Sequence, residues 1–434
     1  MERVAGRGAS AAVLSKELNL SVSPSDRQAL SARIADTRAI LQASVDTGDT
    51  PGIVALIWHR GEVVQTHAVG LRDIEHHLPM ERSTIFAIAS MSKPVTVVAA
   101  LTLIEQGKMK LEDRITRWAP EFANMRVLKR PDAALDDTYP APRDITIDDL
   151  MTHRSGLSYG FLAPSPLSNV LMERVGFGIE SGLSADEWMK SLGSLPLAYA
   201  PGERFNYGFS IDVLGIIIGR VAGSSLREAL HAQVCGPLDM QDTDFWIPPA
   251  KRVRAATIYN AGADLKCFTR AQMSTFTGAS PQAFASGGQG LVSTVDDYLT
   301  FARMLMNGGE VNGRRILKPE TVQLITTDRL TATQRQIPPI VCAPWSTVGF
   351  GLGLSMITNP EAYAATGWGV GSDGAFGWPG MFGGWWQADP KRDLILVWLV
   401  EATPPPPAPN TMPRFPGALA NREFQRLAYA ALPP

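Results

Sequence analysis

The sequence predicts an α+β fold, in which an antiparallel sheet is flanked by helices and a mainly helical lobe is inserted into the chain. Two β-rich runs, at residues 53–58 and 62–69, surround Arg60-Gly61, which is typical of a hairpin. Further strand-like runs return only near the C-terminus, at 349–357, 381–388 and 393–400. Because the strands come from both ends of the chain, the helical segment between them is expected to be an insertion.

Two lobes are expected, because single hydrophobic cores stop growing at roughly 250–300 residues and this chain has 434. We assign residues 25–115 and 285–434 to the sheet lobe and residues 116–284 to the helical lobe. Two long connections, at 359–380 and 403–415, are expected either to shape a substrate cleft or to form surface excursions.

Apolar periodicity predicts helices at both ends of the sheet lobe and one at its centre. The first covers residues 26–48 and the last covers residues 416–431. The central helix begins close to Ser90 and ends at Gly107, a residue suited to the left-handed C-terminal cap. Pro94 fits its first turn, because the amide hydrogen that proline lacks would have had no acceptor there. Ser90 is therefore expected at a helix N-terminus.

Charge and hydropathy argue against several classes of partner. The net charge is −2, and no run of basic residues is long enough to follow a phosphate backbone, so no nucleic-acid partner is expected. No segment reaches the ~18 apolar residues of a membrane span, and the N-terminus lacks the apolar stretch of a secretory signal. A cytoplasmic protein without membrane contact is expected, and its oligomeric state is not indicated.

Neither the cysteines nor the histidines form a metal-ligand pattern. Cys235, Cys267 and Cys342 are odd in number and widely spaced, so we expect buried or incidental thiols. His153 follows a predicted helix and is expected to be a buried, hydrogen-bonded structural residue. No metal site is therefore predicted.

Ser90-Met91-Ser92-Lys93 matches the pattern S-x-x-K. Residues three apart on a helix share one face, about 5–6 Å apart at Cβ, so hydroxyl and amine can meet. A serine hydroxyl is a weak nucleophile that needs a base, and an amine in apolar surroundings can serve as that base. The alternative is a helix cap followed by a surface lysine. Among the lysines of this chain, only Lys93 has Ser or Thr three positions earlier, which favours the catalytic interpretation.

A competing nucleophile is Ser158, within Gly156-Leu157-Ser158-Tyr159-Gly160, which matches the G-x-S-x-G elbow of α/β-hydrolases. That elbow needs a strand before the serine, whereas residues 145–152 are predicted to be a helix with an acidic first turn. It also needs a downstream catalytic histidine, and the only one is His231, inside an amphipathic stretch. We therefore interpret this match as a glycine-rich loop.

Together with the Ser90 motif, the segments ITIDDLMTHRSGLSYG (145–160), PGERFNYGFSIDVLG (201–215) and GWPGMFGGWWQADP (377–390) resemble the serine β-lactamase superfamily. The resemblance covers roughly residues 30–430. The branch that looks nearest is the family VIII carboxylesterases, neighbours of class C β-lactamases and D-alanyl-D-alanine carboxypeptidases. It implies a β-lactamase/penicillin-binding-protein-like fold and a serine hydrolase that needs no cofactor.

The resemblance also implies roles for individual residues. Tyr207 takes the place of the family's second catalytic base, after Pro201-Gly202. Trp378-Pro379-Gly380 matches the W-x-G motif of esterase members, so Trp378 and Gly380 are expected to contact substrate, as is Phe209. The backbone N–H groups of Ser90 and Met381 are expected to form the oxyanion hole. Whether Lys93 or Tyr207 removes the serine proton is left open.

At two positions the sequence differs from β-lactam-recognising members, and both differences indicate which class of substrate to expect. Trp378 stands where those members have the lysine of K-T-G, and Phe209 stands where they commonly have asparagine, two positions after the tyrosine. An apolar site of this kind predicts hydrolysis of short-chain esters, with a small-molecule ester as partner. A β-lactamase or peptidase activity, an acyltransferase activity and a non-catalytic binding role remain as alternatives.

Overall fold

The computed structural model describes residues 36–161, 164–179, 181–273, 275–336, 343–405 and 414–431. Its centre is an eight-stranded sheet in which every pair of neighbours is antiparallel, in the order β12-β13-β14-β15-β16-β1-β2-β3. The strands are β1 (Gly52–His59), β2 (Glu62–Asp73), β3 (Leu78–Pro79), β12 (Val348–Phe350), β13 (Ser355–Ile357), β14 (Phe376–Gly377), β15 (Trp385–Asp389) and β16 (Leu394–Leu399).

The sheet joins the two ends of the chain, as the sequence predicts. The N-terminal strand β1 pairs with the C-terminal strand β16, for example Leu56 with Val397. The turn between β1 and β2 contains Arg60 and Gly61, both with positive φ, as in the tight hairpins predicted there. The run predicted at 349–357 is two short strands, β12 and β13, because Gly353 with φ of 75° turns the chain between them.

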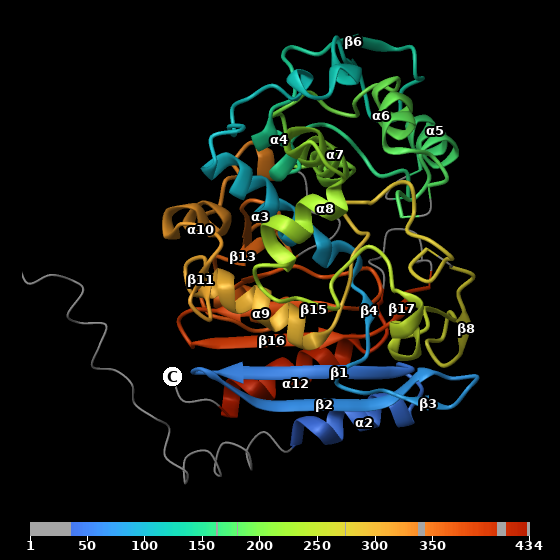
Figure 1. Cartoon of the computed structure of the whole chain (residues 1–434), viewed down its shortest axis with the longest axis vertical. Coiled ribbons are helices and arrows are strands. Elements are labelled where there is room, and N and C mark those ends of the chain that lie inside the picture. The colour runs from blue at the N-terminus through green and yellow to red at the C-terminus, as the bar shows by residue number, and fades with distance from the viewer. Residues whose placement is uncertain are drawn as a thin grey trace, which may run out of the picture.

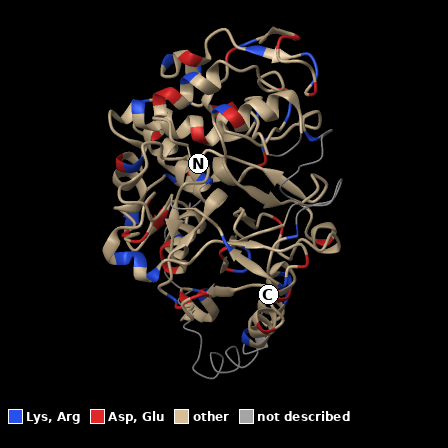
Figure 2. Ribbon diagram, turned by 90° about the vertical axis from the view of Figure 1, so that its right-hand side faces the viewer, with Lys and Arg blue, Asp and Glu red and all other residues tan. Residues whose placement is uncertain are grey.

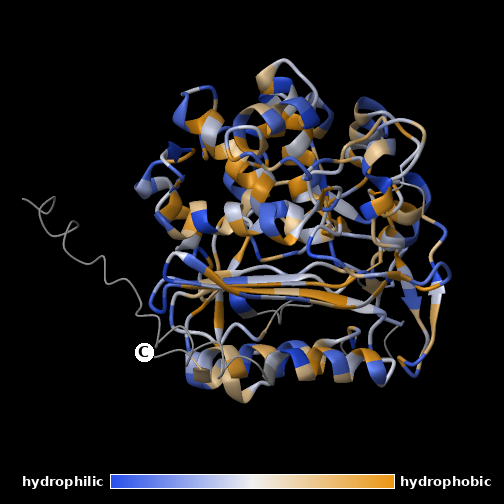
Figure 3. Cartoon of the chain, turned by 60° about the horizontal axis from the view of Figure 1, so that its bottom comes forward, coloured by the Kyte–Doolittle hydropathy of each residue, from blue (hydrophilic) through white to orange (hydrophobic). Residues whose placement is uncertain are grey.

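Helices cover both faces of this sheet (Figures 1 and 3). On one face lie α2 (Asp36–Asp46) and α12 (Ala418–Ala431), which contribute Leu41 and Phe424 to a core with Trp398. On the other face lies α9 (Val295–Met306), whose Tyr298 and Phe301 pack edge-on against Trp386 of β15. The apolar strands β1 and β16 are buried along their whole length because both faces are covered.

The helical lobe stands above the α9 face of the sheet (Figure 1). Its central element is α7 (Ser210–Ala222), which packs against α3 (Ser92–Glu105). Thr146 and Asp149 form a capping box that starts α4, in agreement with the predicted acidic first turn. The remaining helices of this lobe are α4 (Ile147–Met151), α5 (Pro166–Arg174), α6 (Ala185–Gly193) and α8 (Leu226–Leu230), which continues into a π-helical turn, His231–Cys235.

Shorter elements complete the fold. Helices α10 and α11 cover Pro319–Thr326 and Pro360–Ala365, so the predicted long connection 359–380 contains a helix and strand β14. The small sheets comprise β4 (Phe86–Ala87) with β9 (Val292–Ser293), β5 (Arg126–Leu128) with β6 (Thr138–Pro140), β10 (Glu310–Val311) with β11 (Arg314–Arg315), and β17 (Ala402–Thr403) with β7 (Tyr259–Ala261) and β8 (Phe268–Arg270).

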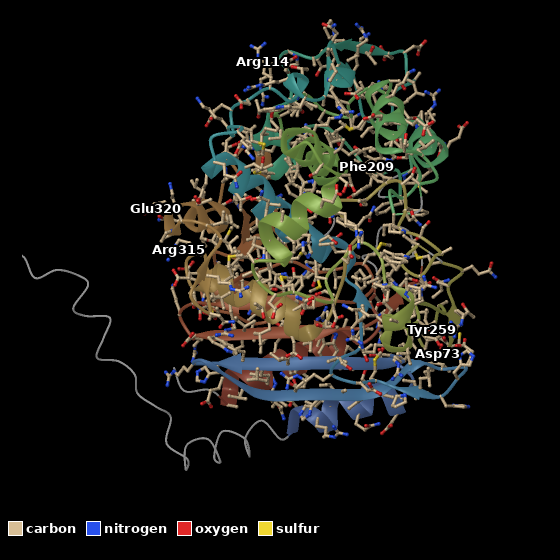
Figure 4. The ribbon with its side chains drawn as sticks, viewed as in Figure 1. Asp73, Arg114, Phe209, Tyr259, Arg315 and Glu320 are labelled. Carbon is tan, nitrogen blue, oxygen red and sulfur yellow. The ribbon has the colours of Figure 1, made fainter. Side chains whose placement is uncertain are left out.

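Residues 259–270, which fall within the predicted helical lobe, contact the edge of the sheet. Strand β7 pairs with β17, and the Tyr259 hydroxyl accepts a hydrogen bond from the Ile74 backbone N–H at the end of β2, at 2.7 Å. Arg270 forms an ion pair with Asp73, 2.7 Å apart, at the same edge, where Figure 4 labels Tyr259 and Asp73 close together. Long-range pairing therefore holds residues 259–270 against the sheet edge, and the boundary at residue 284 remains a prediction.

Several predictions concern residues outside the described part of the chain. These include the start of the first predicted helix, residue Cys342 and residues 406–413 of the predicted connection 403–415. Of the other cysteines, Cys235 is buried and Cys267 is exposed. Basic and acidic residues are interspersed along the ribbon in Figure 2. Within the described ranges, no helix is long and apolar enough to cross a membrane, and no cluster of three metal-ligating side chains occurs.

Candidate active site

Ser90 lies in a short 3-10 helix, Ala89–Met91, that leads directly into α3. Strand β4 ends at Ala87, and Ala89 has φ of 44°, a left-handed conformation that is uncommon for residues with a Cβ. The chain therefore turns sharply between a strand and a helix, and Ser90 is left half-buried at the turn. The predicted C-terminal cap of α3 is also present, because Gly107 has φ of 71°.

The Ser90 hydroxyl contacts both predicted partners. Lys93 Nζ donates a hydrogen bond to Ser90 Oγ at 3.0 Å, and Tyr207 Oη donates to the same oxygen at 2.8 Å. Lys93 comes from the next turn of the same helix, whereas Tyr207 lies 117 residues away in sequence, just before α7. The three functional groups thus meet at one atom, as a nucleophile and its proton acceptors must.

Lys93 is fully buried, with no exposed surface. Besides Ser90, its amine donates a hydrogen bond to the carbonyl oxygen of Gly288, at 2.7 Å. The nitrogen also lies 4.6 Å from the ring centroid of Tyr207 and 5.5 Å from that of Tyr159, where an ammonium is stabilised by the aromatic faces. These contacts rule out the alternative of a surface lysine that reaches into solvent.

The backbone of Gly288 connects Lys93 to the buried carboxyl group of Asp212. Gly288 accepts from Lys93 through its oxygen and donates to Asp212 through its N–H, at 3.2 Å. Asp212 also accepts hydrogen bonds from the Tyr159 hydroxyl, at 3.2 Å, and from the Ser286 hydroxyl. Burial raises the pKa of Asp212, and the positive charge of Lys93 opposes that rise. This network fixes the position of the lysine.

Tyr207 is held by aromatic neighbours and is only 7% exposed. The indole N–H of Trp378 donates to Tyr207 Oη at 3.4 Å, and the two ring centroids are 5.7 Å apart. On another side, the ring of His153 lies 4.7 Å from the ring of Tyr207. The phenol oxygen therefore has a fixed place between Trp378 and Ser90.

His153 is buried as predicted, but the expected hydrogen bonds are not there. Neither ring nitrogen has a hydrogen-bond partner among the described residues. Burial, with a smaller effect of Lys93, holds the pKa of His153 well below 6.5. The imidazole is therefore neutral at pH 7 and acts as a packing group for Tyr207, Phe205 and Phe350.

The predicted oxyanion donors lie on two segments that pack directly against each other. Gly380 approaches the residues before Ser90 so closely that a Cβ on it would lie 2.5 Å from the carbonyl oxygen of Ile88. Only glycine fits there, which explains the glycine of the W-x-G motif, and the substrate contact expected of Gly380 remains a prediction. Met381 follows, half-buried, and Ser90 lies in the first turn of its helix, where backbone N–H groups lack intrahelical acceptors. The oxyanion hole itself remains a prediction.

Two residues predicted to contact substrate are buried in the core. Phe209 has no exposed surface and packs edge-on against Tyr159 and Trp188, at 4.6 and 5.3 Å between ring centroids, and Figure 4 labels it within the helical lobe. Trp378 is 1% exposed and is covered by Tyr207 and Phe350. Their side chains support the site rather than line its surface, because each is enclosed by aromatic rings.

In the described part of the chain, the Ser158 hydroxyl is bonded to an amide rather than to a base. Ser158 follows α4 and a loop, not a strand, as the sequence predicts, and its Oγ accepts a hydrogen bond from the Asn206 amide at 2.7 Å. An amide nitrogen does not accept a proton at neutral pH. The geometry thus favours Ser90 over Ser158 as the nucleophile.

Sequence reasoning missed Gly288, Asp212 and Tyr159. Asp212 carries a signal, because it is the only acidic residue in the otherwise apolar run SIDVLGIIIG. Tyr159 was noted only as a member of the rejected elbow motif. Gly288 acts through its backbone, so the side-chain pattern gives no sign of it.

A buried carboxyl group, Glu401, lies beneath the segment that carries Ser90. It is 1% exposed, and its Oε2 accepts a hydrogen bond from the Ala87 backbone N–H at 2.7 Å, whereas Oε1 has no partner in the described part of the chain. Burial raises the pKa of Glu401 well above 4.5, and the Ala87 hydrogen bond opposes this only in part. The folded protein therefore favours the neutral acid.

Replacing Glu401 by glutamine should flatten the dependence of stability on pH. Because the folded pKa is raised, the contribution of Glu401 to stability is present below pH 4.5 and is lost as the pH rises through the folded pKa. The Tm of Glu401→Gln minus that of the unmodified protein should increase between pH 4.5 and pH 9, by roughly 1 °C for each kcal/mol in a chain of this length. A difference that stays constant across this range would show that the carboxyl group does not titrate as described.

A serine hydroxyl that contacts a buried lysine and a tyrosine is the arrangement expected of a serine hydrolase. The sequence model of the Beta-lactamase family matches residues 37–419, and the chain belongs to that family. Esterase EstB of Burkholderia gladioli is 31% identical over 367 residues, covering 80% of this chain and 85% of the esterase. Protein Rv1367c of Mycobacterium tuberculosis (strain ATCC 25618 / H37Rv) is 43% identical, covering 85% of this chain and 90% of the relative.

A solved structure supports the same assignment. EstCE1, described as a hydrolase with promiscuous acyltransferase activity, superposes with a TM-score of 0.75 at 28% identity and covers 94% of this chain and 100% of its own. The predicted β-lactamase/penicillin-binding-protein-like fold is therefore confirmed. The protein is a serine hydrolase of the Beta-lactamase family.

Proposed function

We propose that the protein is a carboxylesterase that hydrolyses neutral, short-chain esters through an acyl-enzyme on Ser90. The observation that carries this proposal is the convergence of Lys93 Nζ and Tyr207 Oη on Ser90 Oγ, at 3.0 and 2.8 Å. The similarity to esterase EstB supports the substrate class.

The first half of the reaction transfers the acyl group to serine. If Lys93 and Tyr207 both keep their protons, both donate to Ser90 and neither can accept, so the active state is one in which this pair has lost one proton. Ser90 Oγ then attacks the ester carbonyl, its proton passes to the pair, and the backbone N–H groups of Ser90 and Met381 bind the oxyanion. The carbon–oxygen bond to the alcohol breaks, and the pair returns the proton to the departing alkoxide.

The second half of the reaction repeats these steps with water. Water loses a proton to the Lys93–Tyr207 pair and attacks the acyl carbonyl, and the oxyanion again forms at the same backbone donors. The bond to Ser90 Oγ breaks, the serine regains its proton, and the carboxylic acid leaves. No other chemical group takes part in this scheme.

The preference for neutral esters follows from the absence of polar side chains at positions 378 and 209, near the Lys93–Tyr207 pair. Where β-lactam-recognising members have a lysine and commonly an asparagine, this chain has Trp378 and Phe209, both buried, so neither position offers a polar partner to a carboxylate or an amide. A β-lactam carries both a carboxylate and an amide. Such a substrate would leave its polar groups without partners.

We expect kcat/KM for p-nitrophenyl butyrate to exceed that for the cephalosporin nitrocefin by at least about 10²-fold, because polar groups without partners can be rejected by factors of this size or more. Both constants are measured on the full chain with chromogenic assays. Ser90→Ala serves as the control and should remove both activities. A higher constant for nitrocefin would contradict the esterase assignment.

Acyl transfer is a second candidate, and the described activity of EstCE1 favours it. The acyl-enzyme is the same, but an alcohol takes the place of water as acceptor. Adding a primary alcohol to the p-nitrophenyl butyrate assay and separating the products distinguishes the two. Butyrate as the main product supports an esterase, and the new ester as the main product supports a transferase.

A further inference from the structure

Two stacked phenylalanines lie half-exposed beside the catalytic site. Phe161 and Phe177 are 38% and 45% exposed, and their ring centroids are 5.5 Å apart with an interplanar angle of 28°. We propose that this pair, the aromatic platform, binds an apolar ring on the substrate and so selects esters that carry such a ring. The inference rests on the proposed esterase function and names the substrate class of the same site.

A continuous series of rings connects the aromatic platform to the nucleophile. Phe161 stacks on Tyr159 at 4.9 Å with an interplanar angle of 21°, and Tyr159 packs edge-on against Tyr207 at 5.4 Å. The hydroxyl of Tyr207 lies 2.8 Å from Ser90 Oγ. The platform is therefore separated from the reacting groups by the single ring of Tyr159.

A second, independent connection between the aromatic platform and Lys93 runs through Gln289 and the adjacent Gly288. The side chain of Gln289, which is 2% exposed, donates a hydrogen bond to the carbonyl oxygen of Phe177, and the adjacent Gly288 accepts from Lys93 at 2.7 Å. Gly178 has φ of 85°, and a Cβ on it would lie 3.0 Å from Gln289 Nε2 and 3.2 Å from the Phe209 ring. The chain that carries Phe177 is thus held closely against the site.

Exposure of the stacked Phe161 and Phe177 side chains to water is unfavourable, and a ligand that covers them would remove this cost. Single apolar residues on a surface are normal. A stacked aromatic pair that is continuous with a catalytic site instead offers a ligand both apolar surface and ring faces. Because Tyr159 lies between the platform and the catalytic groups, the ring should be joined to the ester carbonyl through a spacer of several bonds. It can belong to the acyl half or to the alcohol half of the ester.

Three esters without a chromophore distinguish a ring on the acyl half from a ring on the alcohol half of the substrate. Their hydrolysis by the full chain is measured as acid release in a pH-stat. Ethyl butyrate has no ring, ethyl 4-phenylbutyrate has a ring on the acyl side, and 2-phenylethyl butyrate has one on the alcohol side. For a ring-bearing ester we expect kcat/KM to be about tenfold higher than for ethyl butyrate, mainly through KM, as for other apolar pocket contacts. The ratio of kcat/KM for the ring-bearing ester to kcat/KM for ethyl butyrate should approach one in Phe161→Ala and Phe177→Ala. Phe161→Tyr should keep the ratio of the unmodified protein.

Tyr139→Ala is the matched control, because Tyr139 is also 37% exposed but lies on β6, and it should leave the ratio unchanged. An advantage confined to one ring-bearing ester assigns the platform to that half of the substrate. A ratio near one in the unmodified protein, or an unchanged ratio in both alanine variants, overturns the proposal.

A binding experiment keeps this test separate from the esterase proposal. The rate at which a fluorophosphonate labels Ser90 is measured with 4-phenylbutan-1-ol or with butan-1-ol present. The phenyl alcohol should slow labelling at about tenfold lower concentration, and Phe161→Ala should abolish that difference. If no ester is hydrolysed but this protection is seen, the esterase assignment fails and the platform stands; equal protection by the two alcohols rejects the platform.

Discussion

Replacing Lys93 by methionine should lower kcat/KM for p-nitrophenyl butyrate by about 10²- to 10⁴-fold, the usual contribution of a general base. Methionine has a similar length and no charge, so it fits the fully buried site of Lys93. It removes the hydrogen bonds to Ser90 and Gly288. The main loss should appear in kcat, because the amine acts in the transition state.

Tyr207→Phe should have an effect of similar size, because it removes the other donor at Ser90 Oγ. Since Lys93 and Tyr207 act as one proton-handling pair, the double variant should be within about tenfold of the slower single variant. If the loss of kcat/KM in the double variant equals the product of the losses in the two single variants, the two residues act independently.

Two controls separate catalysis from folding. Lys108→Met replaces an exposed lysine just beyond α3, and Tyr139→Phe removes an exposed hydroxyl on β6; both should retain the original kcat/KM. The Tm of each active-site variant is measured alongside. Activity within tenfold of the unmodified protein in either Lys93→Met or Tyr207→Phe would remove that residue from the mechanism.

The contact between Ser90 and Lys93 could be predicted because its signal is local. The spacing of Ser90 and Lys93 alone brings them to one helix face, and the apolar residues around them predict a buried amine. Tyr207 needed the family resemblance, since no local pattern links it to a serine 117 residues away. The structure shows that α7 packing against α3 brings the two together.

Other features depend on contacts that no local pattern records. The contact of Tyr259 with the sheet edge could not be predicted, because β7 pairs with β17 far along the sequence. Phe209 was expected at the substrate because of its position relative to Tyr207, but its side chain points into the rings of Tyr159 and Trp188. A motif gives the place of a residue along the chain, whereas packing decides the direction of its side chain.

Ser90→Ala should reduce ester hydrolysis by about 10⁴-fold or more, because it removes the atom that forms the acyl bond. The neighbouring groups remain, so the oxyanion donors and the Lys93–Tyr207 pair can support only a small residual reaction with water. Ser158→Ala should retain activity, because the Ser158 hydroxyl is bonded to an amide rather than to a base.

The most direct measurement is mass mapping of the residue that a fluorophosphonate modifies in the full chain. The label should be found on Ser90, should be absent from Ser90→Ala and should persist in Ser158→Ala. A label on Ser158, or on any other residue when Ser90 is intact and unmodified, would contradict the assignment of Ser90 as the nucleophile.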